Sequence, residues 1–229
     1  MLVLHGFSSS NYYNVVKLAL LEKELPFEER LVYTGATSDG YRPDYLQQSP
    51  IGKVPCLQTP EGPLTESRCI IDYLERAHPE RPLYPDTAFA IAKQNELAQV
   101  IELYLELATR RVIPNMVVGK PPPDNIARDV RAMLSKGAQA LARLARFDGY
   151  ILGGDRFTAA DIAATVHLPT VNNIAKSVLG EDLVTAVPGL GDYLARMAQR
   201  PTLQRINNDR KADLPSFYAH MQKLFAPKS

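Results

Sequence analysis

The sequence predicts a mixed α/β domain over residues 1–80, followed by an all-helical domain over residues 88–229. In the first part, short apolar segments alternate with helical patterns. A linker containing Pro79, Pro82 and Pro85 comes next, and beyond it apolar residues recur at three- and four-residue steps. A chain of 229 residues is long enough to form two such domains.

The first elements predict a strand–helix–strand unit. Residues 2–7 are apolar, which indicates a buried strand, and the polar cluster at 8–11 marks the start of a helix that Pro26 ends. Residues 27–33 predict a second strand, and we expect the strand–helix–strand unit to be parallel and right-handed. Residues 34–42 are polar and predict a loop.

Four further elements complete the first domain. Residues 43–48 predict a short helical turn, and 54–58 and 62–64 predict two strands joined by a tight turn. Residues 68–78 then predict a helix. The order is strand, helix, strand, helix, strand, strand, helix, which is the thioredoxin-like arrangement.

The second domain is expected to be a helical bundle. Residues 89–113 and 126–147 each carry one long helical pattern, with a break at 119–123. Thr158 and Asp161 have the spacing of a capping box, with Asp in place of the usual Glu. We therefore expect a helix to begin after Thr158, and we expect Asp161→Ala to lower stability by about 0.5–2 kcal/mol.

The segment 49–67 carries the strongest functional signals. Val54-Pro55 opens a strand, and if their peptide bond is cis, the backbone N–H and carbonyl of Val54 turn outward and can pair with an extended peptide. Ser67 begins a helix whose free N–H groups suit a carboxylate, and Glu66 beside it suits an ammonium. A strand edge and an ordinary N-cap would explain either signal alone. Together they favour the γ-glutamyl end of glutathione.

The run Ser49-Pro50-Ile51-Gly52-Lys53-Val54-Pro55, followed by Leu64-Thr65-Glu66-Ser67, resembles the glutathione-binding half of the cytosolic glutathione transferase family. The resemblance continues through 154–162 and 188–201 and weakens after about residue 208. It implies the glutathione transferase fold, glutathione as co-substrate, a small hydrophobic electrophile as second substrate, and a homodimer. The glutathione-binding residues that it implies are Lys53, Val54, Pro55, Glu66 and Ser67.

Transferase chemistry needs an ionised thiol, and a free thiol has a pKa of about 8.5. One hydrogen bond donated to the sulfur lowers that pKa by about one to two units. Family members with a tyrosine donor carry it at the end of the first strand, where this chain has Gly6-Phe7. The resemblance to serine-type members instead implies Ser10, at a helix start whose field favours a thiolate. Ser10 can also be an ordinary N-cap. The other candidate donors are Ser8, Ser9 and Tyr12.

Several alternatives remain open at this point. No cysteine lies between Met1 and Tyr33, which disfavours glutaredoxin-like chemistry but leaves a glutathione-dependent disulfide reductase or peroxidase. A glutathione-binding protein without turnover is a further alternative. The natural electrophile cannot be identified, because that pocket would be built from scattered apolar positions.

Composition excludes several function classes. The chain has 26 Lys and Arg against 25 Asp and Glu, so nucleic acid and anionic membranes are not expected as partners. Two cysteines, Cys56 and Cys69, form no disulfide framework and are expected to be buried. The four histidines have no ligand spacing, so we expect no metal site. The N-terminus lacks the features of a signal peptide, and no apolar run spans a membrane, so a cytoplasmic protein is expected.

Overall fold

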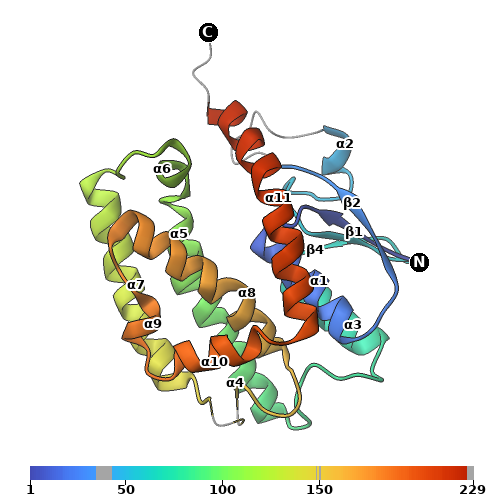
Figure 1. Cartoon of the computed structure of the whole chain (residues 1–229). Coiled ribbons are helices and arrows are strands. Elements are labelled where there is room, and N and C mark those ends of the chain that lie inside the picture. Colours follow the sequence, from blue (N-terminus) through green and yellow to red (C-terminus); the bar gives the residue numbers. More distant parts are fainter. Residues whose placement is uncertain (35–42, 148, 150, 226–229) are drawn as a thin grey trace. The chain divides into compact units, whose positions relative to one another are not determined.

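The computed structural model describes residues 1–34, 43–147, 149 and 151–225 of the chain (Figure 1). Contacts divide the chain into two units, one formed by Met1–Pro82 with Pro201–Ser229 and the other by Leu83–Arg200. The loop expected at 34–42 lies outside the described residues except for Thr34.

The first unit contains one four-stranded sheet with the order β2-β1-β3-β4. β1 pairs in parallel with β2 and antiparallel with β3, and β3 pairs antiparallel with β4. The parallel strand–helix–strand unit is therefore confirmed. β3 starts at Cys56, two residues later than expected, because Pro55 has no N–H to donate to the ladder. The strands are β1 (Leu2–Gly6), β2 (Phe27–Leu31), β3 (Cys56–Gln58) and β4 (Pro63–Thr65).

Three helices complete the thioredoxin-like part of this unit, namely α1 (Asn11–Glu22), α2 (Pro43–Leu46) and α3 (Ser67–Ala77). α1 packs against α3, and its middle is fully buried. Gly6 ends β1 where α1 passes close by, since a Cβ there would lie 2.3 Å from Cδ2 of Tyr13. Glycine at this position thus allows α1 to pack tightly on the end of β1.

A long final helix, α11 (Pro201–Phe225), packs along α1 and groups with the first unit. From the sequence, these residues are expected to belong to a second domain spanning 88–229. This domain boundary stays a prediction. By its contacts α11 is part of the unit that holds the sheet.

The second unit is all-helical, as the sequence predicted. Its helices are α4 (Ala88–Gln99), the π-helical η2 (Val100–Glu106), α5 (Leu107–Arg110), α6 (Ile113–Val118), α7 (Asp124–Leu144), α8 (Ala159–Ile174), the π-helical η3 (Ala175–Leu179), α9 (Leu183–Ala186) and α10 (Leu190–Met197).

The helical pattern expected over 89–113 is present as a continuous run over residues 88–110, but it changes winding along its length and ends three residues earlier than expected. Its middle widens into η2, and its last turn ends at Arg110, before the separate helix α6. The break has a physical cause, because Pro114 has no N–H to donate to the carbonyl of Arg110. The second expected helix is present as α7.

The capping box predicted at the start of α8 is confirmed. The Thr158 side chain accepts from the N–H of Asp161, and the Asp161 carboxylate accepts from the N–H of Thr158. α8 is buried along most of its length and packs against α4 and η2. The box therefore sits at the start of the central helix of the second unit.

Candidate functional site

Strand register places the predicted site segments at one end of the sheet. His5, near the end of β1, pairs with Cys56, the first residue of β3. Cys56 in turn pairs with Thr65, the last residue of β4. The chain therefore enters or leaves the sheet at this end through three segments, residues 8–10, 54–55 and 66–67.

The segment before β3 is fixed by side-chain hydrogen bonds. The peptide bond between Val54 and Pro55 is cis, the isomer from which the pairing of Val54 with an extended peptide was inferred. The Ser49 hydroxyl donates to the carbonyl of Lys53 at 2.8 Å, and the N–H of Lys53 donates to the oxygen of the same hydroxyl at 3.0 Å. The Tyr45 hydroxyl donates to the same carbonyl at 3.2 Å. Val54 therefore follows directly after Lys53, a residue whose N–H and carbonyl are both fixed by hydrogen bonds.

The start of α3 has an unusual backbone. Glu66 is the N-cap residue and adopts φ 65°, a left-handed conformation that costs a non-glycine residue about 1–3 kcal/mol. Its exposed side chain makes no capping hydrogen bond. Ser67, the first helical residue, is buried. The Glu66 carboxylate is therefore not used to cap α3, which suits a role in ligand binding.

Ser10 is the N-cap of α1, and its Oγ accepts from the N–H of Tyr13 at 3.4 Å. The ordinary capping role is thus observed. A serine hydroxyl has one donor and two acceptor sites, so capping leaves its proton able to serve a sulfur atom. The rival donors differ in their surroundings. Ser9 Oγ is buried without a hydrogen-bond partner among the described residues, whereas Ser8 and Tyr12 are half-buried.

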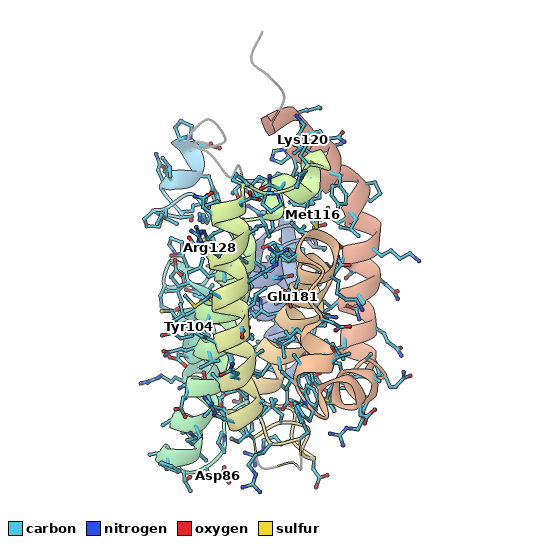
Figure 2. All side chains as sticks on the ribbon, turned by 90° about the vertical axis from the view of Figure 1, so that its left-hand side faces the viewer. Asp86, Tyr104, Met116, Lys120, Arg128 and Glu181 are labelled. Atoms are coloured by element: carbon cyan, nitrogen blue, oxygen red, sulfur yellow. The ribbon has the colours of Figure 1, made fainter. Side chains whose placement is uncertain are left out.

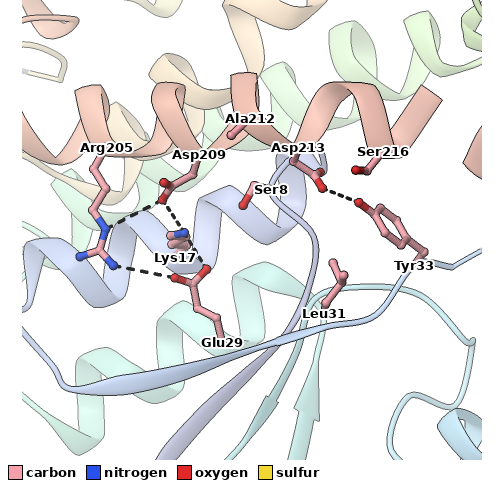
Figure 3. A pocket seen from close by; sticks show the side chains of 10 residues that line it. All are labelled: Ser8, Lys17, Glu29, Leu31, Tyr33, Arg205, Asp209, Ala212, Asp213 and Ser216. Atoms are coloured by element: carbon pink, nitrogen blue, oxygen red, sulfur yellow. Dashed lines mark hydrogen bonds and ion pairs between the residues drawn. The ribbon is translucent and has the colours of Figure 1, made fainter. Parts of the chain in front are cut away.

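A cavity of about 500 Å³ lies between α1, β2 and α11 within the first unit (Figure 3). Its most buried charge is Lys17, whose ammonium lies 2.6 Å from Glu29 and 2.8 Å from Asp209. The Tyr13 hydroxyl also donates to Glu29. Because both of its carboxylate neighbours lie within hydrogen-bond distance, the buried charge of Lys17 is compensated.

Asp213 of α11 reaches the loop between β1 and α1. Its Oδ2 accepts from the N–H of Ser9 at 2.7 Å, and its Oδ1 accepts from the Tyr33 hydroxyl at 2.5 Å. Burial and this bond to Asp213 raise the pKa of Tyr33 to about 12. Asp213 was not predicted from the sequence, because nothing near it along the chain indicates a partner 204 residues away.

The two cysteines have different surroundings. Cys56 is buried, as predicted, and burial raises the pKa of its thiol to about 11. Cys69 lies on the outer face of α3 and is exposed, so the expectation that it is buried is wrong.

Within 1–34, 43–147, 149 and 151–225, no group of three His, Cys, Asp or Glu residues could hold a metal ion. In the same part of the chain, every helix is too short or too polar to cross a membrane.

Comparisons with known proteins match both parts of the chain to one family. Residues 4–82 match the family model "Glutathione S-transferase, N-terminal domain", and residues 123–196 match "Glutathione S-transferase, C-terminal domain". A glutathione S-transferase of Pseudomonas putida is 41% identical over 217 residues, covering 95% of this chain and 96% of the relative.

Two further relatives are less similar. A glutathione S-transferase of Methylobacterium radiotolerans, solved in complex with glutathione sulfonate, is 27% identical with a TM-score of 0.69, covering 89% of this chain and 93% of that one. A probable elongation factor 1-gamma of Arabidopsis thaliana is 26% identical, covering 92% of this chain but 50% of its own length. The chain therefore belongs to the glutathione S-transferase family, an enzyme family whose fold and co-substrate, glutathione, are those that the sequence predicted.

Proposed function

We propose that this protein transfers the thiolate of glutathione to a small hydrophobic electrophile, as a detoxifying enzyme of the cytoplasm. The observation that carries the proposal is the meeting of three segments at one end of the sheet, namely 8–10, 54–55 and 66–67. They offer a hydroxyl, an extended backbone pair and a helix start, which are the groups that a tripeptide thiol requires.

Each segment has a role in this proposal. The backbone of Val54 pairs with the cysteinyl part of glutathione, and the first turn of α3 at Ser67 receives the γ-glutamyl carboxylate. Glu66 pairs with the γ-glutamyl ammonium, for which its exposed and uncapped carboxylate is suited. Lys53 and Pro55 flank the peptide, and Lys53 is exposed.

Ser10 is the thiol-activating residue in this proposal. Its hydroxyl donates to the sulfur and stabilises the thiolate by about 1.5–3 kcal/mol, which lowers the thiol pKa by about one to two units. The N-terminus of α1 adds a favourable field. At neutral pH these effects convert a thiol that is a few per cent ionised into one that is substantially ionised.

The similarity to elongation factor 1-gamma supports a competing hypothesis, a chain that binds glutathione without turnover. Three assays separate the hypotheses: conjugation of glutathione to an aryl halide, reduction of a small disulfide, and reduction of an organic hydroperoxide. The proposal predicts that conjugation is the fastest of the three. Calorimetric binding of glutathione without conjugation above the uncatalysed rate would favour the competing hypothesis. Absence of binding would refute both.

We also propose that the protein is a homodimer. Large apolar side chains are exposed on the second unit, with Leu103 50%, Tyr104 47% and Leu107 51% exposed, on one stretch of η2 and α5. Figure 2 looks onto this side of the helical unit, with Tyr104 in view. A contiguous exposed apolar surface favours a two-fold, self-complementary interface.

Light scattering tests this assembly. We expect twice the chain mass at micromolar concentration and a shift to the monomer in Leu107→Glu, because a buried charge at a two-fold interface is introduced twice. Val118→Glu, at a residue of α6 that is 47% exposed, is the matched control and should leave the mass unchanged. A monomeric wild-type chain would contradict the proposal.

A further inference from the structure

The loop that carries the candidate thiol-activating hydroxyls is held from within its own segment of the chain. The Asn14 side-chain amide donates to the carbonyl of Ser8 at 2.7 Å, and Asn14 is fully buried. The N–H of Ser10 donates to the carbonyl of Phe7 at 3.0 Å, and the carbonyl of Ser10 accepts from the N–H of Asn14 at 3.1 Å. These contacts fix the two ends of the loop to β1 and α1.

The middle of the loop is held by a residue from the far end of the chain. The N–H of Ser9 donates to the carboxylate of Asp213 at 2.7 Å. A hydrogen bond to an ionised acceptor is about twice as strong as one between neutral groups. The other oxygen of this carboxylate accepts from the Tyr33 hydroxyl, as Figure 3 shows, so the carboxylate itself is oriented.

α11 has other contacts that keep it in place. Phe217, one turn beyond Asp213, stacks on Phe7 with ring centroids 5.5 Å apart. One turn before Asp213, Asp209 pairs with the buried Lys17 at 2.8 Å. The helix therefore stays anchored on both sides when the carboxylate of Asp213 is removed, and a substitution at Asp213 acts mainly on the loop.

We propose that Asp213 is a positioning residue, which holds Ser9 so that the hydroxyl of Ser10 points toward the bound sulfur. This inference rests on the proposed function and extends it to α11. Asp213 acts through the Ser9 N–H and does not itself touch glutathione. A displacement of about 1 Å at a reacting group can reduce a rate on the order of a hundredfold, so a loop held by one bond at its middle is sensitive to losing it.

Three variants test the proposal by amide hydrogen exchange of the segment 1–13 and by steady-state conjugation kinetics. In Asp213→Ala we expect exchange at Ser9 to rise about tenfold or more and kcat to fall about ten- to a hundredfold, with KM for glutathione changed less than about threefold. In Asp213→Asn we expect kcat within about threefold of wild type, because the amide oxygen still accepts from Ser9. Asp209→Ala, the matched control on the same face of α11, should leave kcat and Ser9 exchange near wild type.

A double variant separates positioning from a general loss of stability. If Asp213 acts through Ser10, adding Asp213→Ala to Ser10→Ala should reduce kcat by less than about threefold more. A full additive loss would overturn the proposal, as would faster Ser9 exchange with a wild-type kcat. If Asp213→Ala does not fold, an Asp213→Asn kcat reduced more than about tenfold would overturn it equally.

The failure of the proposed function is distinguishable from the failure of this inference. A wild-type chain without glutathione conjugation would refute the function. Ser9 exchange in Asp213→Ala would still decide, without any substrate, whether Asp213 holds the loop. Wild-type exchange in that variant would overturn the inference even where conjugation is fast.

Discussion

Two helix starts in this protein use similar capping chemistry to different degrees. At the start of α8, Thr158 and Asp161 exchange backbone-to-side-chain hydrogen bonds, and Asp161 is 1% exposed. Its carboxylate also accepts from the Thr158 hydroxyl, from the N–H of Gly153 and from the Tyr193 hydroxyl, each at 2.8 Å. The polar groups of this start are bonded within the protein.

The start of α1 has a simpler cap. Ser10 receives a bond of 3.4 Å from the N–H of Tyr13, the same length as the corresponding bond at Thr158, but the third helical residue, Tyr13 itself, has no carboxylate to return a bond to the cap. Ser10 is half-buried, so its hydroxyl can be reached from outside. We call a start with a reciprocated cap saturated and one whose cap residue receives no returned side-chain bond unsaturated. The comparison indicates that the saturated start has a structural role, while the unsaturated one at the end of a sheet is suited to a ligand.

The largest expected effect is the loss of stability when the capping box at the start of α8 is removed. Asp161→Ala leaves the buried donors of Thr158 and Tyr193, and the half-buried N–H of Gly153, without their acceptor. We expect unfolding free energy to fall by about 3 kcal/mol or more, beyond the value for a cap alone, because each unsatisfied buried group costs about 1–3 kcal/mol. Denaturant unfolding measures this loss. A fall below about 1 kcal/mol would show that water or rearrangement replaces the carboxylate.

The next effect is on rate, at the unsaturated start. Ser10→Ala should raise the pKa of bound glutathione by about one to two units and lower conjugation at neutral pH roughly ten- to a hundredfold. Glutathione affinity should change far less, because the lost bond serves the thiolate rather than the resting thiol. The rate should partly recover at higher pH. A pH–rate profile measures all three.

Substitutions of the rival donors are the controls for this prediction. Ser9→Ala removes a buried hydroxyl that has no partner among the described residues. Tyr12→Phe removes the hydroxyl of a half-buried side chain. Both should keep a near-wild-type rate at neutral pH. If Ser10→Ala keeps the wild-type rate and one of these loses it, that residue activates the thiol instead.

Much of this contrast can be predicted from sequence because its partners are close along the chain. The capping box is visible because Thr158 and Asp161 are three residues apart, and the order of strands and helices along the chain follows from the alternation of short apolar segments with helical patterns. Val54-Pro55 and Glu66-Ser67 could be proposed as binding residues for the same reason, since the relevant backbone features are local.

Other features depend on distant partners or on small changes in winding. Asp213 could not be assigned a role, because its partners Ser9 and Tyr33 lie far away in the sequence. The π-helical η2 was missed because the apolar spacing of a helix changes little over 7 residues. Tertiary contacts, rather than local pattern, decide such features.

The smallest expected effects are those of removing two tyrosine hydroxyls, one that donates to Asp161 near the start of α8 and one that donates to Asp213 near the start of α1. Tyr193 is buried and donates to Asp161, whereas Tyr33 is half-buried and donates to Asp213. Tyr193→Phe should cost about 1–3 kcal/mol, because water cannot easily reach the vacated acceptor. Tyr33→Phe should cost only about 0.5–1.5 kcal/mol, since solvent can replace its hydroxyl. Its kcat should stay within about threefold of wild type, because Asp213 still holds Ser9.

The pH dependence of stability sharpens the Tyr33 prediction. The native state holds the Tyr33 proton more tightly, with a pKa of about 12, than the unfolded chain does at about 10. The unfolded state therefore loses this proton first, so the stability contributed by Tyr33 is complete below pH of about 10 and falls as pH rises toward 12. Tyr33→Phe should flatten the decline of unfolding free energy over that interval relative to wild type, in denaturant titrations at several pH values. An unchanged slope would mean that the hydroxyl of Tyr33 titrates normally and that Asp213 is oriented by Ser9 alone.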